Sequence, residues 1–201
     1  MKILFLTNKS NTEINQYSEI LQKYNSDDKI DFYFEKIDEK KFLNEKYDLI
    51  MKDRYHFELN DFLFSNNLRF INFHPSYLPN NMKSDSNLWS IIDETKKGSS
   101  IIEMKDKNWE KYNIICQNEI FLNEEDTLKS SFKKCIDLFP ILLKLNWEKI
   151  RNNSYKRNYY SIKDGKIYYG NEKGDFLETL QKKYDTLVKD IPELWKKYKK
   201  F

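Results

Sequence analysis

The feature that most constrains the fold is an alternation of short apolar runs with amphipathic helical segments in the first third of the chain. The apolar runs predict strands at residues 2–7, 30–34, 47–51 and 68–73. The segments between them predict helices at residues 12–24, 40–44 and 59–66. Such an alternation indicates an α/β domain with a mainly parallel sheet. Because ligands of parallel sheets bind beyond the carboxyl ends of the strands, we expect a site where the fourth strand ends.

The rest of the chain continues this pattern and then changes. Its segments predict a helix at residues 87–95, strands at 100–104 and 113–120, a long helix at 127–152, a β-hairpin at 157–170 and a last helix at 176–200. Asp164 and Gly165 suit the type I′ turn of that hairpin. We therefore predict a main domain over residues 1–125 and a region of helix, hairpin and terminal helix over residues 126–201.

Composition excludes several classes of protein. No glycine precedes Gly98, so the chain lacks the early glycines of a dinucleotide fingerprint or a P-loop. A net charge of +3 is too small to argue for nucleic acid. Two isolated cysteines form neither a disulfide framework nor a metal site. No apolar run approaches the roughly 20 residues of a membrane span, and the start does not resemble a signal peptide. We expect a cytoplasmic protein.

The residues with the clearest chemistry follow the fourth apolar run. Asn72 and His74 lie two apart, so their side chains should project to the same side of the strand. Pro75 favours an extended conformation of His74. An asparagine amide can donate to a developing oxyanion, and a fixed histidine can act as a general acid or base. The alternative is that neighbouring backbone groups satisfy both side chains.

Residues 72–79, which read N-F-H-P-S-Y-L-P, resemble the N-x-H-x-S-x-L-P segment of the N10-formyltetrahydrofolate-dependent formyltransferases. Three later segments look like the branch that acts on sugar nucleotides: D-S-N-L-W-S at 85–90, T-K-K-G at 95–98 and N-I-I-C-Q at 113–117. The resemblance covers roughly residues 1–152 and is strongest from 72 to 120.

The resemblance implies a Rossmann-type, mainly parallel sheet with flanking helices and the chemistry of formyl transfer. The donor would be N10-formyltetrahydrofolate, and the acceptor would be the amine of a nucleotide-linked, dTDP-type amino sugar used in lipopolysaccharide biosynthesis. Asn72 would stabilise the oxyanion, and His74 would be the acid or base. The substrate-binding residues implied are Ser76, Tyr77, Trp89 and Lys97. The folate-binding residues implied are Tyr55, Phe57, Asp106 and Asn108. In this branch a C-terminal hairpin commonly builds a homodimer interface.

One family residue is replaced. Where the family has an Asp in D-x-G, this chain has Glu110-Lys111-Tyr112, and Glu110 would be a stand-in for the missing Asp. Two alternatives remain open. One is a catalytically impaired protein of this fold that binds a nucleotide sugar or a partner, and the other is an acyl transferase with a different donor.

Overall fold

The computed structural model describes residues 1–8, 12–23, 25–64 and 68–200. These residues form two compact units that interleave along the chain. Unit 1 comprises Met1–His74, Ile101–Cys116 and Pro140–Ser161. Unit 2 comprises Pro75–Ser100, Gln117–Phe139 and Ile162–Phe201. The predicted division of the chain near residue 125 describes the order of elements in the sequence, not these units, and it stays a prediction.

A seven-stranded sheet contains most of the strands, in the order β2-β1-β3-β4-β6-β7-β8. Its strands are β1 (Lys2–Leu6), β2 (Lys29–Tyr33), β3 (Leu49–Lys52), β4 (Arg69–His74), β6 (Gly98–Met104), β7 (Tyr112–Glu119) and β8 (Tyr159–Tyr160). Strand β1 pairs in parallel with β2 and β3, and β3 pairs in parallel with β4. The pairing of β8 with β7 is antiparallel. The sheet confirms the mainly parallel α/β fold that the alternating pattern predicts.

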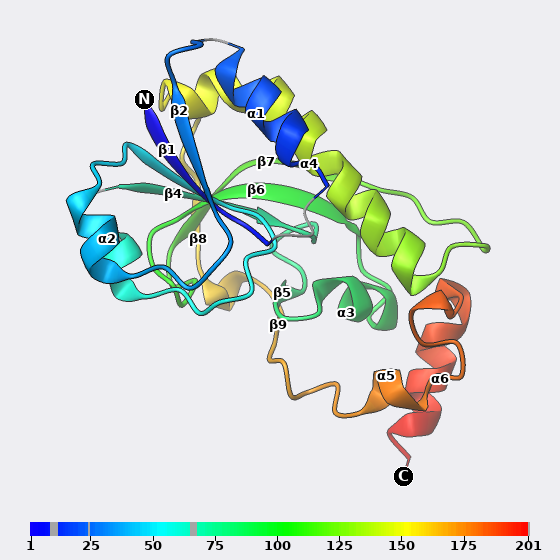
Figure 1. The fold of residues 1–201 in the computed structure, drawn as a ribbon. Helices are drawn as coiled ribbons and strands as arrows, with labels where there is room; N and C mark the ends of the chain where they lie inside the picture. The colour runs from blue at the N-terminus through cyan, green and yellow to red at the C-terminus, as the bar shows by residue number, and fades with distance from the viewer. Residues whose placement is uncertain (9–11, 24, 65–67, 201) are drawn as a thin grey trace. The chain divides into compact units, whose positions relative to one another are not determined.

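Unit 1 buries its strands under helix α1 (Ile14–Gln22) and the last turns of α4 (Leu128–Arg151), which lie side by side (Figure 1). The indole nitrogen of Trp147 on α4 donates to the carbonyl of Leu21 on α1 at 3.1 Å. On β1, Phe5 contacts the ring of Tyr17 on α1 at a centroid distance of 4.9 Å. Helix α2 (Glu39–Asn44) and the 3-10 turn η1 (Asp61–Phe64) complete this unit.

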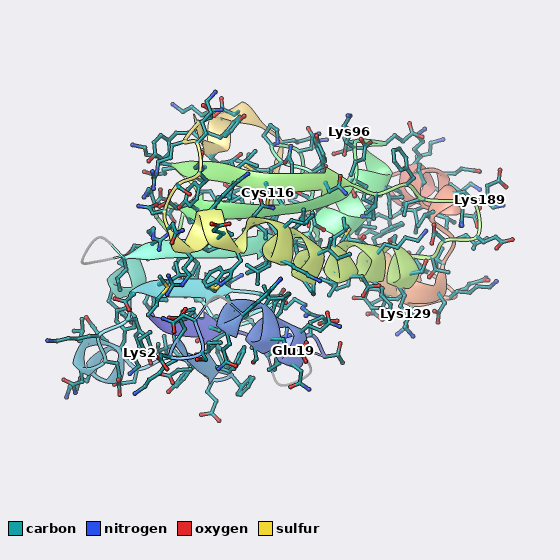
Figure 2. The ribbon with its side chains drawn as sticks, turned by 90° about the horizontal axis from the view of Figure 1, so that it is seen from above. Lys2, Glu19, Lys96, Cys116, Lys129 and Lys189 are labelled. Carbon is teal, nitrogen blue, oxygen red and sulfur yellow. The ribbon has the colours of Figure 1, made fainter. Side chains whose placement is uncertain are left out.

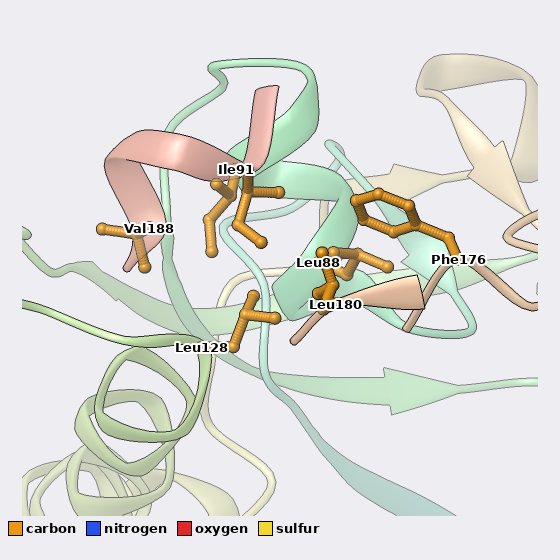
Figure 3. Packing of buried hydrophobic residues seen from close by; sticks show 7 residues of the cluster. Leu88, Ile91, Leu128, Phe176, Leu180 and Val188 are labelled. Carbon is orange, nitrogen blue, oxygen red and sulfur yellow. The ribbon is translucent and has the colours of Figure 1, made fainter. Parts of the chain in front are cut away.

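Unit 2 has its own apolar core around α3 (Ser86–Ile92) (Figure 3). The elements packed there are α5 (Phe176–Thr179), η4 (Val188–Asp190) and α6 (Ile191–Tyr198). The core residues are Leu88, Ile91, Leu128, Phe176, Leu180, Val188 and Ile191. A two-stranded sheet of β5 (Met82–Lys83) and β9 (Ile167–Tyr168) belongs to the same unit.

The predicted hairpin over residues 157–170 is wrong. Its first half, β8, pairs with β7, whereas its second half, β9, pairs in parallel with β5. A 3-10 turn, η2 (Ile162–Asp164), separates the two halves. Gly165 does not have the positive φ that a type I′ turn requires. Instead, a Cβ atom at Gly165 would lie 1.9 Å from the carbonyl oxygen of Pro79, so glycine permits a close backbone approach. The predicted homodimer therefore loses the element on which it was based, and it stays untested.

Two other predicted helices differ from the structure. The last helix, expected over residues 176–200, is broken into α5, η3 (Lys183–Asp185), η4 and α6. Leu180 and Thr186 adopt extended conformations that end α5 and η3. Pro192 lies in the first turn of α6, where its missing backbone donor costs no hydrogen bond. The helix expected over 59–66 is only the turn η1, and residues 65–66 lie outside the described residues, as does residue 24 of the first helix.

The surface of each unit is rich in lysine. Lys129 at the start of α4 and Lys189 on η4 extend away from their elements (Figure 2). Lys189 forms an ion pair with Glu124 at 3.3 Å, so part of this positive charge is neutralised locally. Within the part of the chain that the structure describes, no helix is both long enough and apolar enough to cross a bilayer.

Candidate active site

Strand β4 carries the two residues that the sequence singled out. Asn72 is 3% exposed and His74 is 5% exposed, at the carboxyl end of a strand that pairs in parallel with β3. Side chains two residues apart in a strand lie on the same face. The backbone of β4 therefore fixes the amide and the imidazole as a pair, as the sequence predicts.

The imidazole of His74 is bordered by Trp109, which sequence reasoning missed. The two ring centroids are 4.8 Å apart, and the ring planes meet at 69°. Trp109 is 8% exposed and has a φ of +67°, a conformation that is uncommon for a bulky residue. The indole of Trp109 also contacts the ring of Tyr112, at a centroid distance of 5.4 Å. Because strained backbone often marks a functional site, Trp109 belongs to the candidate site.

Asp106 organises the loop that carries Trp109. Its Oδ1 accepts hydrogen bonds from the backbone N–H groups of Asn108 at 2.8 Å and Glu110 at 3.0 Å. Its Oδ2 accepts one from the N–H of Lys111 at 2.9 Å. Three N–H groups of the loop are therefore engaged by one carboxylate. Asp106 therefore shapes the loop from within, and its role as a folate ligand stays a prediction.

The side chain of Glu110, the expected stand-in for the family Asp, is exposed. Asn108 is also exposed. Both residues lie in the same short loop as Trp109, which contacts His74. Their roles as proton acceptor and folate ligand stay predictions.

A second missed residue lies beside Asn72. Lys52 ends β3 and is the registered neighbour of Asn72 on β4. Its Nζ donates to Oδ1 of Asn72 at 3.4 Å. Burial lowers the pKa of Lys52, although the nearby carboxylate of Asp53 partly opposes this. The sequence signal that could have identified Lys52 is a lysine placed directly after the apolar run Leu49–Met51.

An ionic network fixes the segment after β3. The carboxylate of Asp53 is fully buried and accepts hydrogen bonds from the hydroxyl of Tyr17 at 3.0 Å and from Arg54 at 2.8 Å. Arg54 also forms an ion pair with Glu13 on the approach to α1. Burial, followed by the negative charge of Asp53, raises the pKa of Tyr17 well above 10.0. The network anchors the residues that lead into the predicted folate pair.

The two predicted folate residues after this network, Tyr55 and Phe57, differ in their surroundings. The hydroxyl of Tyr55 is hydrogen-bonded within the protein, whereas the ring of Phe57 is exposed. The hydroxyl of Tyr55 donates to the carbonyl of Glu35 at 2.6 Å and accepts from the N–H of Ile37 at 3.1 Å. Phe57 lies against Tyr55 at a centroid distance of 5.3 Å and is 41% exposed. Of the two, only Phe57 presents a large ring surface to a ligand.

Two of the four predicted substrate residues are held by internal contacts of unit 2. Ser76 donates to the carbonyl of Asn80 at 2.9 Å. Lys97 donates to the carbonyl of Asn87 at 3.1 Å and to the hydroxyl of Ser90 at 3.0 Å. Burial lowers the pKa of Lys97 to about 8. These contacts tie Lys97 to α3.

Of the other two predicted substrate residues, Tyr77 is half-buried and Trp89 is buried, at 3% exposed. The Nζ of Lys96 lies 5.3 Å from the ring centroid of Tyr77. Trp89 stacks on Tyr168 at 3.9 Å with an interplanar angle of 5°, and its edge meets Trp195 at 5.2 Å. These three rings line part of a cavity of about 360 Å³ in unit 2.

The structure thus divides the predicted site residues between the units. Unit 1 holds Asn72, His74, Glu110, Tyr55, Phe57, Asp106 and Asn108. Unit 2 holds Ser76, Tyr77, Trp89 and Lys97. The two cysteines do not offer a nucleophile: burial raises the pKa of Cys116 on β7 (Figure 2) to about 12, and it raises the pKa of Cys135 as well.

The architecture is that of the formyltransferases, a Rossmann-like α/β domain whose sheet is mostly parallel. No family model matches the chain. Among solved structures, the formyltransferase PseJ from Anoxybacillus kamchatkensis is similar to it, in complex with UDP-4,6-dideoxy-4-formamido-L-AltNAc and tetrahydrofolate. The two chains are 26% identical with a TM-score of 0.82, and the match covers 95% of this chain and 97% of the other.

Two further structures share the fold. A 4-N formyltransferase from Francisella tularensis is 22% identical, with a TM-score of 0.76 over 95% of this chain and 85% of its own. An N-formyltransferase from Helicobacter canadensis, in complex with folinic acid and dTDP-3-aminofucose, is 16% identical, with a TM-score of 0.65 over 83% and 70% of the two chains. The resemblance to sugar N-formyltransferases predicted from the sequence is thereby confirmed.

Proposed function

We propose that this protein is an N-formyltransferase that moves a formyl group from N10-formyltetrahydrofolate to the amine of a nucleotide-linked amino sugar. The observation that carries the proposal is the buried pair of Asn72 and His74 at the carboxyl end of β4. The similarity to PseJ supports it, because that structure holds both tetrahydrofolate and a formylated UDP-sugar.

The donor supplies an activated formyl group whose carbon the sugar amine attacks. As the new C–N bond forms, negative charge develops on the formyl oxygen, and the amide of Asn72 donates a hydrogen bond to it. Such a donor contributes on the order of 100- to 1,000-fold in rate. When the bond to N10 breaks, the proton released by the amine must reach N10. His74 is the group on the same face of β4 that can carry this proton.

The loop of residues 105–111 would complete the site. In the proposal Glu110, whose side chain is exposed, accepts the proton of the attacking amine and passes it to His74, which delivers it to N10. The indole of Trp109 borders the imidazole and limits its movement. The exposed ring of Phe57 is the best placed of the predicted folate residues to contact a pterin.

In the proposal the nucleotide binds to unit 2, where the half-buried ring of Tyr77 offers an aromatic surface and the buried ring of Trp89 supports the site from within the core. We favour a dTDP-linked 4-amino sugar, in keeping with the sequence motifs. The formyltransferases similar to the chain include one with a UDP-sugar and one with a dTDP-sugar, so both nucleotides belong in the test.

The test is a discontinuous assay with N10-formyltetrahydrofolate and a panel of dTDP- and UDP-linked amino sugars, with the formylated product detected by mass spectrometry. We expect Asn72→Ala and His74→Ala to lower turnover by about 100-fold or more. Asn118→Ala on β7 is the matched control, because the side chain of Asn118 is exposed. Unchanged turnover in both site variants would overturn the assignment.

A second candidate is a binding protein of the same fold with impaired catalysis. The observation that favours it is the loop of residues 105–111, in which Asp106 engages three N–H groups and Trp109 lies against His74. This candidate predicts that calorimetry detects binding of a nucleotide sugar but no binding of 5-formyltetrahydrofolate.

A further inference from the structure

The lysine at the end of β3 has a fixed relation to the proposed oxyanion donor. Strands β3 and β4 run in parallel, and their register places Lys52 opposite Asn72. Registered neighbours on adjacent strands project to the same face of a sheet. The contact between Nζ of Lys52 and Oδ1 of Asn72 at 3.4 Å is therefore set by the backbones of both strands.

A lysine is energetically unfavourable at this position, because burial disfavours its charged form. The rest of β3, from Leu49 to Met51, is fully buried, and an apolar side chain at its end would suffice for packing. Lys52 as a whole is half-buried, but desolvation lowers the pKa of its amine. A desolvated amine that contacts a polar site residue is typical of functional sites. The sheet itself does not require Lys52.

The chemistry of the two side chains decides which way the amide faces. An asparagine amide has one accepting end and one donating end, and only the Nδ2 end can hydrogen-bond an oxyanion. Lysine has three donors and no acceptor, so it can bind the Oδ1 end alone. Among the described residues, no partner takes a hydrogen bond from Nδ2 of Asn72. The contact with Lys52 thus leaves the donating end available.

We infer that Lys52 is a positioning residue, which holds the amide of Asn72 with Nδ2 turned toward the formyl oxygen. An ammonium group on Oδ1 also polarises the amide and makes its N–H groups better donors, since linked hydrogen bonds strengthen one another. This inference rests on the proposed function for the role of Asn72, but the contact itself does not depend on it.

The kinetic test compares Lys52→Met with wild type in the whole protein. Methionine keeps the length of the side chain and removes the donor. We expect kcat to fall by about 10- to 100-fold, because a misplaced catalytic group costs that much, with little change in KM for the amino sugar. Lys133→Met, on the exposed face of α4, is the matched control for the loss of one lysine.

A double-mutant cycle separates positioning from a general structural effect. In an Asn72→Ala background the amide is absent, so Lys52→Met should add no further loss in kcat. An equal loss in both backgrounds, or wild-type kcat in Lys52→Met itself, would overturn the inference. If the methionine variant does not fold, Lys52→Leu takes its place.

A spectroscopic test does not need activity. The side-chain amide resonances of Asn72, identified by their absence from Asn72→Ala, should shift in Lys52→Met and exchange faster by rotation about the amide bond. Unchanged resonances would overturn the inference. If wild type formylates no acceptor, the proposed function fails, while this experiment still decides whether Lys52 holds Asn72.

Discussion

Replacing Lys97 with methionine should stabilise the protein at neutral pH. Lys97 is 5% exposed, and burial lowers its pKa from 10.5 to about 8. Below pH 8 the folded protein therefore keeps a charged amine in a poorly solvated place. A shift of this size corresponds to about 3.5 kcal/mol, at about 1.4 kcal/mol for each pKa unit. Methionine has a similar length and carries no charge.

The sign of the pH dependence follows from linkage. Between about pH 8 and 10.5 the unfolded chain binds more protons at Lys97 than the folded protein does, so wild-type stability rises with pH in this window. The two hydrogen bonds that Lys97 donates to Asn87 and Ser90 offset part of the cost, at about 1 kcal/mol each. Lys97→Met should thus be about 1–2 kcal/mol more stable than wild type at pH 7. The advantage should shrink toward pH 10.5 and disappear there.

Urea denaturation of both proteins between pH 7 and 10 measures this difference directly, because other titrating groups affect both proteins alike. Lys96→Met is the control, since the side chain of Lys96 is 59% exposed and its effect should stay flat with pH. A stability difference for Lys97→Met that does not change with pH would refute the buried-charge argument. Loss of activity in the stabilised variant would indicate that Lys97 also serves the substrate.

Three further substitutions test the packing of each unit. Gly165→Ala should lower the melting temperature, because its Cβ atom would lie 1.9 Å from the carbonyl oxygen of Pro79. Trp147→Phe should cost about 1–3 kcal/mol in urea denaturation, because the carbonyl of Leu21 loses a buried donor. Burial raises the pKa of Asp28, but hydrogen bonds from Arg151 and the terminal amine outweigh it and lower the pKa below 3.8. Asp28→Asn should therefore be less stable than wild type at pH 7, and denaturation at a series of lower pH values should show the difference shrinking below about pH 4.

The sequence predicted the sheet well because hydrophobic periodicity decides it locally. Residues 69–74 and 49–52 include short continuous apolar runs, which are typical of strands in a covered parallel sheet. The hairpin failed for the opposite reason. Asp164-Gly165 is a strong turn signal, but distant strands compete for the residues on either side, with β7 taking Tyr159 and β5 taking Ile167. Non-local pairing of this kind leaves no mark in a local pattern.

The part of the candidate site that lies on a strand could be predicted from the sequence. Asn72 and His74 could be placed from their spacing alone, since parity in β4 determines their common face. Lys52 needed the register between two strands, which a single sequence does not reveal. Predicting the position of Trp109 would have required knowledge of its positive φ and of the turn around Asp106. Neither feature has a sequence signature in the run K-D-K-N-W.

The two sides of the candidate site differ in what holds them. Lys52, Asn72 and His74 take their positions from β3 and β4, whose main-chain pairing is shared along both strands. The loop with Trp109 takes its shape from the hydrogen bonds of a single carboxylate, that of Asp106. One substitution in the loop can therefore rearrange what borders the imidazole of His74 while the strand pair stays in place. Glu110 and Lys111 stand in this adjustable part, and Tyr112 begins β7 directly after it. A departure from the family pattern in the loop is therefore compatible with an intact Asn72 and His74.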